Sequence, residues 1–239
     1  GRSMGTFGED CAAKYKFTRE QQDAFAIASV QRAKAATESG AFQDEITPVT
    51  VKGRGGDTVI SIDEGPGKVK LDKIATLKPA FKKENGTITA ASSSSINDGA
   101  AALVMMTESH AKKIGAKPIA RIVGHATHAQ QPEWFSTAPV GAVAKLFKKT
   151  GWTVKDVDLW EVNEAFAVVP MALMHELDVS HEIVNVNGGA CALGHPIGAS
   201  GARIMVTLIH ALKARGKKRG VATLCIGGGE GTAVALELL

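Results

Sequence analysis

A glycine-rich stretch at residues 186–201 constrains the fold of this chain more than any other segment. Glycine lacks a Cβ, so it permits turns and close backbone approaches that other residues resist. His195 lies within this stretch and directly precedes Pro196, which fixes its own φ and disfavours helical backbone at the residue before it. The sequence therefore predicts a constrained turn that presents His195. The glycines of the stretch are Gly188, Gly189, Gly194, Gly198 and Gly201.

The turn is followed by a pattern typical of a helix at residues 202–214, for which Ser200 is the expected N-cap. The N-terminus of that helix would point back at the turn, where it favours developing negative charge. Taken alone, the stretch also fits a simple glycine loop whose histidine only fills space. A second stretch, residues 224–231, weakens that simpler interpretation because it presents Cys225 beside another glycine cluster.

Strand and helix patterns alternate from residue 118 to the end, which favours a layered α/β fold. We expect the last two strands to pair antiparallel through the turn at residues 227–231. The expected strands are 119–123, 157–162, 182–187, 220–225 and 232–238, and the expected helices are 140–150, 163–177 and 202–214.

The first hundred residues are less regular. Thr18 and Gln21 form the pattern of a capping box at the start of a helix that runs towards Gly40. A strand with an edge proline is expected at residues 46–51, followed by an exposed excursion rich in glycine and aspartate. Residues 100–107 fit either a helix or a strand made of small residues, before a further helix that ends near residue 115.

Three polar side chains follow expected strands: Asn163, His195 and Cys225. Ligand sites in α/β sheets gather at the carboxyl ends of strands, so these groups are expected to converge. Each has a plain structural alternative: the asparagine as a helix cap, the histidine as a core residue and the cysteine as a small buried hydrophobe. Their joint occurrence favours a catalytic site.

Composition excludes several classes of function. The chain has 239 residues and a net charge of +4, too mild to argue for nucleic acid, and no basic run is interleaved with aromatic residues. Three cysteines at unrelated spacings match neither a disulfide framework nor a zinc site, which favours a reduced, cytoplasmic protein without a metal. The apolar runs are too short to span a bilayer, so no membrane partner is expected.

Three short segments together resemble the C-terminal motifs of the thiolase family, in the family's order and rough spacing: Asn163–Phe166, Gly194–Gly198 and Cys225–Gly229. The resemblance extends to Ser3–Gly5, Leu77–Phe81 and Ile96–Ala101, so it covers essentially the whole chain. It is strongest to the members that act on acetyl-CoA.

The resemblance implies a Claisen condensation of two acetyl-CoA molecules to acetoacetyl-CoA, and its thiolytic reverse. It also implies a layered αβαβα core made of two similar α/β halves. By this resemblance, residues 1–95 match the loop domain that covers coenzyme A, residues 96–117 match the last elements of the N-terminal half, and residues 118–239 match the complete C-terminal half.

The family's nucleophilic cysteine stands in a Cys-x-Ser-Gly context in the first half of the chain, and no cysteine here has that context. The resemblance therefore implies the C-terminal portion of a thiolase, inactive without the missing N-terminal half. That half is an expected partner, together with coenzyme A and further copies in a dimer or tetramer. No cofactor is expected, because coenzyme A thioesters are the substrates.

The resemblance also implies roles. His195 would accept the proton of the missing nucleophile and hydrogen-bond a thioester oxygen, and Asn163 would hold a water that completes this oxyanion site. Cys225 would remove the α-proton of the second acetyl group, with a pKa lowered by its polar glycine turn. The amide of Gly227 would contribute to a second oxyanion hole.

Contacts to coenzyme A are implied for Ser94 and, along the pantetheine channel, for Met4, Phe81 and Phe166. An arginine of the family is missing after Asp63–Pro66, and Lys68 or Lys70 would replace it. Two alternatives stay open. One is a 3-ketoacyl-CoA thiolase of fatty-acid degradation, and the other is a non-catalytic module that binds coenzyme A or serves assembly.

Overall fold

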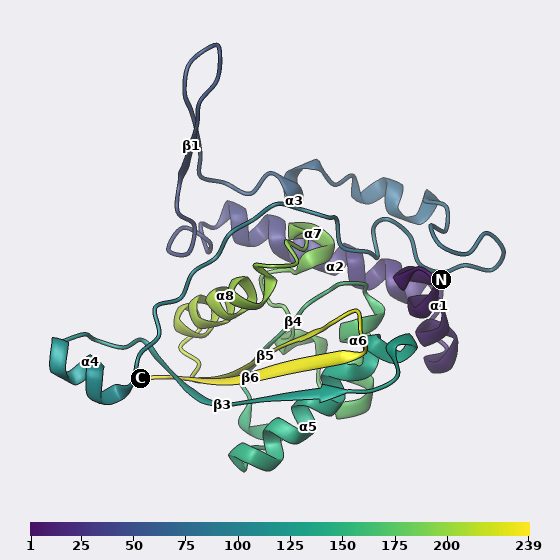
Figure 1. The fold of residues 1–239 in the computed structure, drawn as a ribbon. Coiled ribbons are helices and arrows are strands. Elements are labelled where there is room, and N and C mark those ends of the chain that lie inside the picture. Colours follow the sequence, from purple (N-terminus) through teal and green to yellow (C-terminus); the bar gives the residue numbers. More distant parts are fainter.

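A mixed four-stranded sheet forms the centre of the protein, in a computed structural model that describes residues 1–239 (Figure 1). The strand order is β3-β6-β5-β4, with β4 and β5 parallel and the other two pairs antiparallel. The antiparallel pairing predicted for the last two strands is confirmed. The strands are β3 (Ala120–Ala129), β4 (Leu159–Val162), β5 (Arg219–Cys225) and β6 (Glu230–Leu238).

Helices cover both faces of this sheet. On one face, α5 (Ala138–Thr150) and α6 (Val168–Leu177) enclose a core that includes Val221 and Ala235. On the other face, α8 (Ser200–Ala214) packs on Ala222 and Leu236. Neighbouring strand residues thus point into different cores, as expected where side chains alternate along a strand. The buried residues of α8 recur at helical spacing, which gives the helix one apolar face: Ile204, Leu208, Ala211 and Leu212.

The first part of the chain forms a helical layer beside the sheet. It contains α1 (Met4–Tyr15) and α2 (Arg19–Glu38), and α2 lies against the short helices α3 (Gly65–Lys68) and α7 (Ala190–Leu193). A hairpin of β1 (Val49–Val51) and β2 (Thr58–Ile60) projects away from the body, and all of its strand residues are exposed (Figure 1). The remaining elements are α4 (Glu108–Ile114) and four 3₁₀ helices: η1 (Leu71–Thr76), η2 (Pro132–Thr137), η3 (Val154–Asp156) and η4 (His181–Ile183).

Local signals in the sequence predicted several boundaries correctly. The capping box of α2 is present: the amide of Gln21 donates to the hydroxyl of Thr18 at 3.2 Å, and the amide of Thr18 donates to the side chain of Gln21 at 2.9 Å. Gly151 terminates α5 in the left-handed conformation, with φ of 76°. No helix is long and apolar enough to cross a membrane.

Other expectations are wrong. The strand expected at residues 182–187 is reduced to a bridge between Val184 and Trp160, beyond η4. The helix expected from Asn163 begins only at Val168, so Asn163 is not a helix cap. Ser200 is the first residue of α8 rather than its cap, which is Ala199.

Three further differences concern residues 100–106, α1 and the strand expected at residues 46–51. Residues 100–106 adopt neither helix nor strand, and α1 was not expected from the sequence. The strand expected at residues 46–51 is shorter and belongs to the projecting hairpin. Residues 100–106 and the hairpin strand are largely exposed, so local propensity alone did not determine their structure.

Candidate active site

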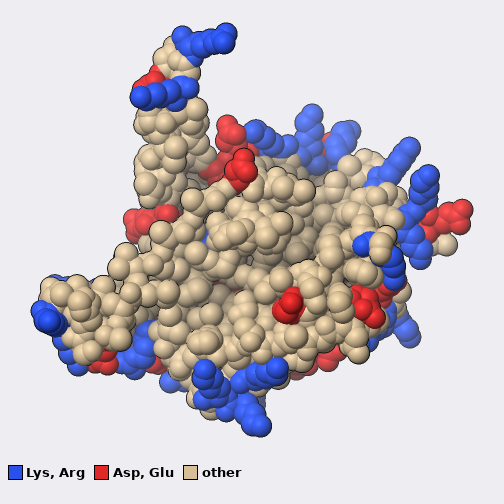
Figure 2. Space-filling model, viewed as in Figure 1, with Lys and Arg blue, Asp and Glu red and all other residues tan.

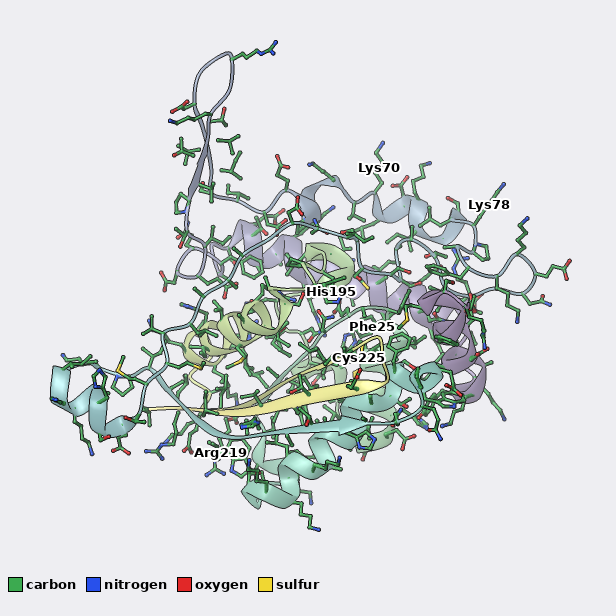
Figure 3. The ribbon with its side chains drawn as sticks, in the orientation of Figure 1. Phe25, Lys70, Lys78, His195, Arg219 and Cys225 are labelled. Atoms are coloured by element: carbon green, nitrogen blue, oxygen red, sulfur yellow. The ribbon has the colours of Figure 1, made fainter.

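His195 lies in the loop between α7 and α8, where two other segments hold it (Figure 3). Its backbone amide donates to the carbonyl of Ser95 at 3.0 Å, which fixes the turn against residues 92–97. Its ring nitrogen Nδ1 lies 2.5 Å from the hydroxyl of Ser200, and Nε2 lies 3.4 Å from the side-chain nitrogen of Asn163. The imidazole therefore sits between the first residue of α8 and the end of β4.

Asn163 joins this imidazole to the strand that carries Cys225. Its amide donates to the carbonyl of Thr223 at 3.0 Å, so it continues the pairing of β4 with β5 one residue past the last residue of β4. Its side chain is buried, and Oδ1 has no hydrogen-bond partner within the chain. His195 contacts Asn163, and Cys225 ends the neighbouring strand, so all three residues lie at the carboxyl edge of the two parallel strands that the sequence indicated.

A buried carboxylate behind the site was missed by sequence reasoning. Glu164 accepts hydrogen bonds from the hydroxyl of Ser29 at 2.7 Å, from the side chain of Asn185 at 2.8 Å and from the amide of Cys191 at 2.9 Å. The hydroxyl of Ser29 in turn accepts from the amide of Gly189 at 3.0 Å. These bonds tie the glycine loop and α2 to the end of β4. The only sequence signal was an acidic residue that directly follows Asn163.

Gly194 ends α7 beside His195, at a backbone φ of 84°. That conformation favours glycine, and a Cβ here would overlap the side chain of Asn97. A substitution at this position would therefore push residues 96–97 away from the loop that presents His195.

Cys225 stands at the end of β5, and its side chain is buried. Burial raises the pKa of this thiol to about 12, a backbone hydrogen bond opposes the shift, and the nearby thiol of Cys11 adds to it. The expected lowering of the pKa is therefore wrong for this chain, because desolvation outweighs the polar turn. Cys225 is a neutral thiol at neutral pH, which is the acid form of an acid–base pair.

Burial lowers the pKa of His195, and the positive charge of Arg203 lowers it further. The imidazole is therefore neutral at neutral pH, and one of its ring nitrogens has a free lone pair. A neutral imidazole is the form that accepts a proton as a general base.

The apolar residues predicted to contact substrate lie next to one another. The thioether of Met4 is 3.8 Å, and its terminal methyl 3.7 Å, from the point where a Cβ on Gly227 would stand. The rings of Phe81 and Phe166 meet edge to face with 5.7 Å between centroids, and the Phe81 ring covers Gly5. Together they form one apolar wall along α1, beside the turn that follows Cys225.

The serine run connects this wall to the histidine loop. The amide and the hydroxyl of Ser94 both donate to the carbonyl of Ala165, each at 3.1 Å. Since Ser95 holds the amide of His195, residues 94 and 95 bridge the two motif segments. The hydroxyl of Ser94 is thus engaged by the protein's own backbone.

The two lysines offered as replacements for the missing arginine differ. Lys68 pairs with Glu64 at 2.8 Å on the surface, whereas Lys70 is exposed and points outwards (Figure 3). Lys70 therefore remains available for an anionic group.

A thiol, a neutral imidazole and a buried amide at one sheet edge define an acid–base site of an α/β enzyme. Two family models match the chain in succession: "Thiolase, N-terminal domain" over residues 1–109 and "Thiolase, C-terminal domain" over residues 116–238. The chain belongs to the thiolase family.

Among similar proteins, a "Probable acetyl-CoA acetyltransferase" of Dictyostelium discoideum is 54% identical over 100% of this chain and 58% of its own length. The crystal structure of the Bacillus anthracis acetyl-CoA acetyltransferase superposes with a TM-score of 0.96 at 46% identity, over 100% of this chain and 60% of that one. The predicted α/β thiolase-like fold is thereby confirmed.

Two further solved structures are similar. Human mitochondrial 3-ketoacyl-CoA thiolase has a TM-score of 0.89 at 40% identity, over 98% of this chain and 59% of that one. A thiolase of Ascaris suum, solved in complex with coenzyme A, has a TM-score of 0.90 at 41% identity, over 100% of this chain and 60% of that one. The chain thus spans about three fifths of the length of the relatives that it matches.

Proposed function

We propose that the protein to which this chain belongs condenses two acetyl-CoA molecules to acetoacetyl-CoA and catalyses the thiolytic reverse. The observation that carries the proposal is the imidazole of His195, held 3.4 Å from Asn163 at the strand edge that also carries Cys225. The names of the relatives support acetyl-CoA as the substrate.

In the first half-reaction, Nε2 of His195 takes the proton of a nucleophilic thiol supplied from outside these 239 residues. That thiolate attacks the thioester carbon, and coenzyme A leaves with the proton returned from His195. The lowered pKa of His195 supports this role, because the ring is neutral before the reaction.

In the second half-reaction, the sulfur of Cys225 takes an α-proton from a second acetyl-CoA. The resulting carbanion attacks the acyl carbon, and the nucleophilic sulfur leaves as a thiolate that takes the proton now held by Cys225. Since the pKa of Cys225 is raised here, its thiol must release its own proton to solvent before the step, and the substrate and the rest of the protein would have to alter its surroundings. A water on Asn163 and the amide of Gly227 would stabilise the oxyanions.

The proposal assigns binding of coenzyme A to Ser94, to the apolar wall of Met4, Phe81 and Phe166, and to Lys70. It keeps the division into residues 1–95, 96–117 and 118–239, with no resident cofactor or metal. The proposal also assigns the protein to the cytoplasm and gives it a role in lipid metabolism.

The exposed surface supports a further partner. A charge-poor area occupies the centre of the face in Figure 2, and several large apolar side chains near α4 and the site loops are exposed. We propose that the nucleophile-bearing half covers this surface, and that the assembled protein forms dimers or tetramers. The exposed side chains are Ile96, Val104, Met105, Met106, Ile197 and Ile226.

The test combines this chain with the part of the Dictyostelium discoideum relative that lies outside the region matched by this chain. We expect no acetoacetyl-CoA from the 239-residue chain alone and measurable condensation from the co-expressed pair. In the active pair, His195→Ala should lower acylation and Cys225→Ser should lower condensation alone, each by roughly 10²–10⁴-fold. Condensation by the isolated chain would refute its inactivity.

Substrate length separates the alternatives. Faster thiolysis of long 3-ketoacyl-CoA than of acetoacetyl-CoA by the active pair would favour the fatty-acid thiolase, which the human structural neighbour keeps open. A pair that binds coenzyme A but neither condenses nor cleaves would favour a non-catalytic module.

A further inference from the structure

The hydroxyl of Ser200 lies 2.5 Å from Nδ1 of His195, closer than any other side chain that contacts this ring. Ser200 is 1% exposed and is the first residue of α8, so its position is set by the helix. Its hydroxyl also lies 3.0 Å from the carbonyl of Pro196 in donor geometry. Water does not compete for this hydroxyl, because it is buried.

The protons of this cluster can be counted. A serine hydroxyl has one proton, and if that proton goes to the carbonyl of Pro196, its oxygen can only accept from Nδ1 of His195. Nδ1 must then carry the ring proton. The neutral ring has no second proton, so Nε2 is left with a free lone pair.

The opposite side of the ring leads to the same assignment. The amide nitrogen of Asn163 faces Nε2 at 3.4 Å, and an amide nitrogen donates but does not accept. With the amide in this orientation, Nε2 is the acceptor. Two neighbours on different elements, Asn163 after β4 and Ser200 on α8, thus favour the same tautomer.

We propose that Ser200 is a positioning residue that holds His195 in the tautomer protonated on Nδ1, so that Nε2 faces the reacting groups as a base. The significance for catalysis rests on the proposed acyl-transfer function, whereas the tautomer is a property of the chain itself. Without the Ser200 hydroxyl, Nδ1 loses its acceptor, and the ring is free to move its proton to Nε2 or to rotate.

A second arrangement places the protons of Ser200 and His195 in the opposite positions. If Ser200 donated to Nδ1 instead, the proton would sit on Nε2, and the side-chain oxygen of Asn163 would have to turn towards it. That arrangement would leave His195 unable to accept a proton through Nε2. The two arrangements therefore predict opposite protonation of the same two nitrogens.

Long-range ¹H–¹⁵N NMR of the 239-residue chain labelled at histidine distinguishes them, with His195→Gln used to assign the signals. At neutral pH we expect Nδ1 to be protonated and Nε2 to be unprotonated. Ser200→Ala should shift the population towards Nε2–H, and Ser200→Thr, which keeps the hydroxyl, should restore the original pattern.

Two control variants isolate the effect. Thr207→Val removes a buried hydroxyl from the same helix that bonds Glu45 rather than His195, and should leave the tautomer unchanged. Asn163→Ala should also leave Nδ1 protonated, because Ser200 still holds it. A proton on Nε2 in the unmodified chain, or an unchanged tautomer in Ser200→Ala, would overturn the proposal.

In the active pair, Ser200→Ala should slow acylation roughly 10–100-fold, less than the loss of the base itself. If the pair proves inactive while the NMR result is as expected, the acyl-transfer proposal fails and the positioning role of Ser200 stands. If acylation is normal in Ser200→Ala although the tautomer has shifted, the catalytic significance of the tautomer is refuted.

Discussion

Residues 219–225 and residues 100–106 are both rich in small and apolar side chains, yet they have opposite fates. The first segment is β5, which lies between β4 and β6 and has buried residues along most of its length. The second segment joins no sheet, and Val104 is 89% exposed. The contrast shows that an apolar sequence becomes a strand only where a neighbouring strand pairs with its backbone.

The neighbours of the two segments explain the difference. The strand β5 pairs with both adjacent strands and receives helices on its two faces. Of residues 100–106, Leu103 packs against the core on α8, whereas the others have little cover. We therefore infer that residues 100–106 belong to the surface that, as proposed above, the nucleophile-bearing half covers.

The largest expected difference between the segments is in amide hydrogen exchange. Amides of β5 should exchange only on global unfolding, whereas residues 100–106 donate no backbone hydrogen bond. Exchange in residues 100–106 should therefore be about 10³-fold faster or more, relative to intrinsic rates. Hydrogen–deuterium exchange mass spectrometry measures both segments in one experiment. Equal protection would break the comparison, and a gain of protection at 100–106 in the active pair would sharpen it.

A core substitution beside β5 should have the next largest effect. Leu208 on α8 is fully buried against the sheet, so Leu208→Ala should lower the free energy of unfolding by about 2–5 kcal/mol. Val104→Ala, the matched removal of an aliphatic side chain from the exposed segment, should change it by less than about 0.5 kcal/mol. Urea unfolding of both variants is the measurement, and similar losses in the two would contradict the contrast.

The same contrast shows how much of the molecule the sequence could predict. Elements that begin or end at capping residues or glycine turns were predicted well. These are the capping box at Thr18, the terminating Gly151 and the strand pair joined by residues 227–231. The strand expected at 182–187 was wrong because its apolar pattern serves a loop, in which the side chain of Asn185 bonds the backbone of Val162 instead of a strand.

The candidate site divides in the same way. Asn163, His195 and Cys225 were predictable because each belongs to a short motif at a strand edge or in a glycine loop. Glu164 and Ser200 act through contacts between segments distant in sequence or through a hydroxyl that resembled an ordinary helix cap. The pKa of Cys225 was predicted in the wrong direction because burial is a tertiary property.

The sheet that contains β5 also contains a buried acidic side chain that lowers stability. The resulting pH dependence of the free energy of unfolding is the third prediction. Glu161 on β4 is buried, and burial raises its pKa to about 8, opposed by Arg203 at 3.8 Å. The folded state thus binds a proton that the unfolded state releases near pH 4.5, so stability falls as pH rises from about 5 to 8.

Glu161→Gln should remove much of that fall, a gain of order 1–3 kcal/mol at pH 8 and little change at pH 5. Glu45, whose pKa burial raises to about 7, should retain a smaller slope of the same sign. Urea unfolding at several pH values tests this, with the exposed Glu108→Gln as the matched control. An unchanged slope in Glu161→Gln would show that this carboxyl is not the source.

The smallest expected effect on stability comes from a charge placed in the exposed segment. Met105 is 68% exposed, so Met105→Lys removes no core contact and should change the free energy of unfolding by less than about 0.5 kcal/mol. The same charge should reduce self-association of the isolated chain, because exposed apolar patches drive association. It should also weaken assembly with the nucleophile-bearing half, since that half would have to bury the lysine. Sedimentation of the chain and co-purification of the pair measure the two effects. Assembly unaffected by Met105→Lys would show that Met105 stays exposed in the whole protein, and its contrast with β5 would then not be a consequence of the missing partner.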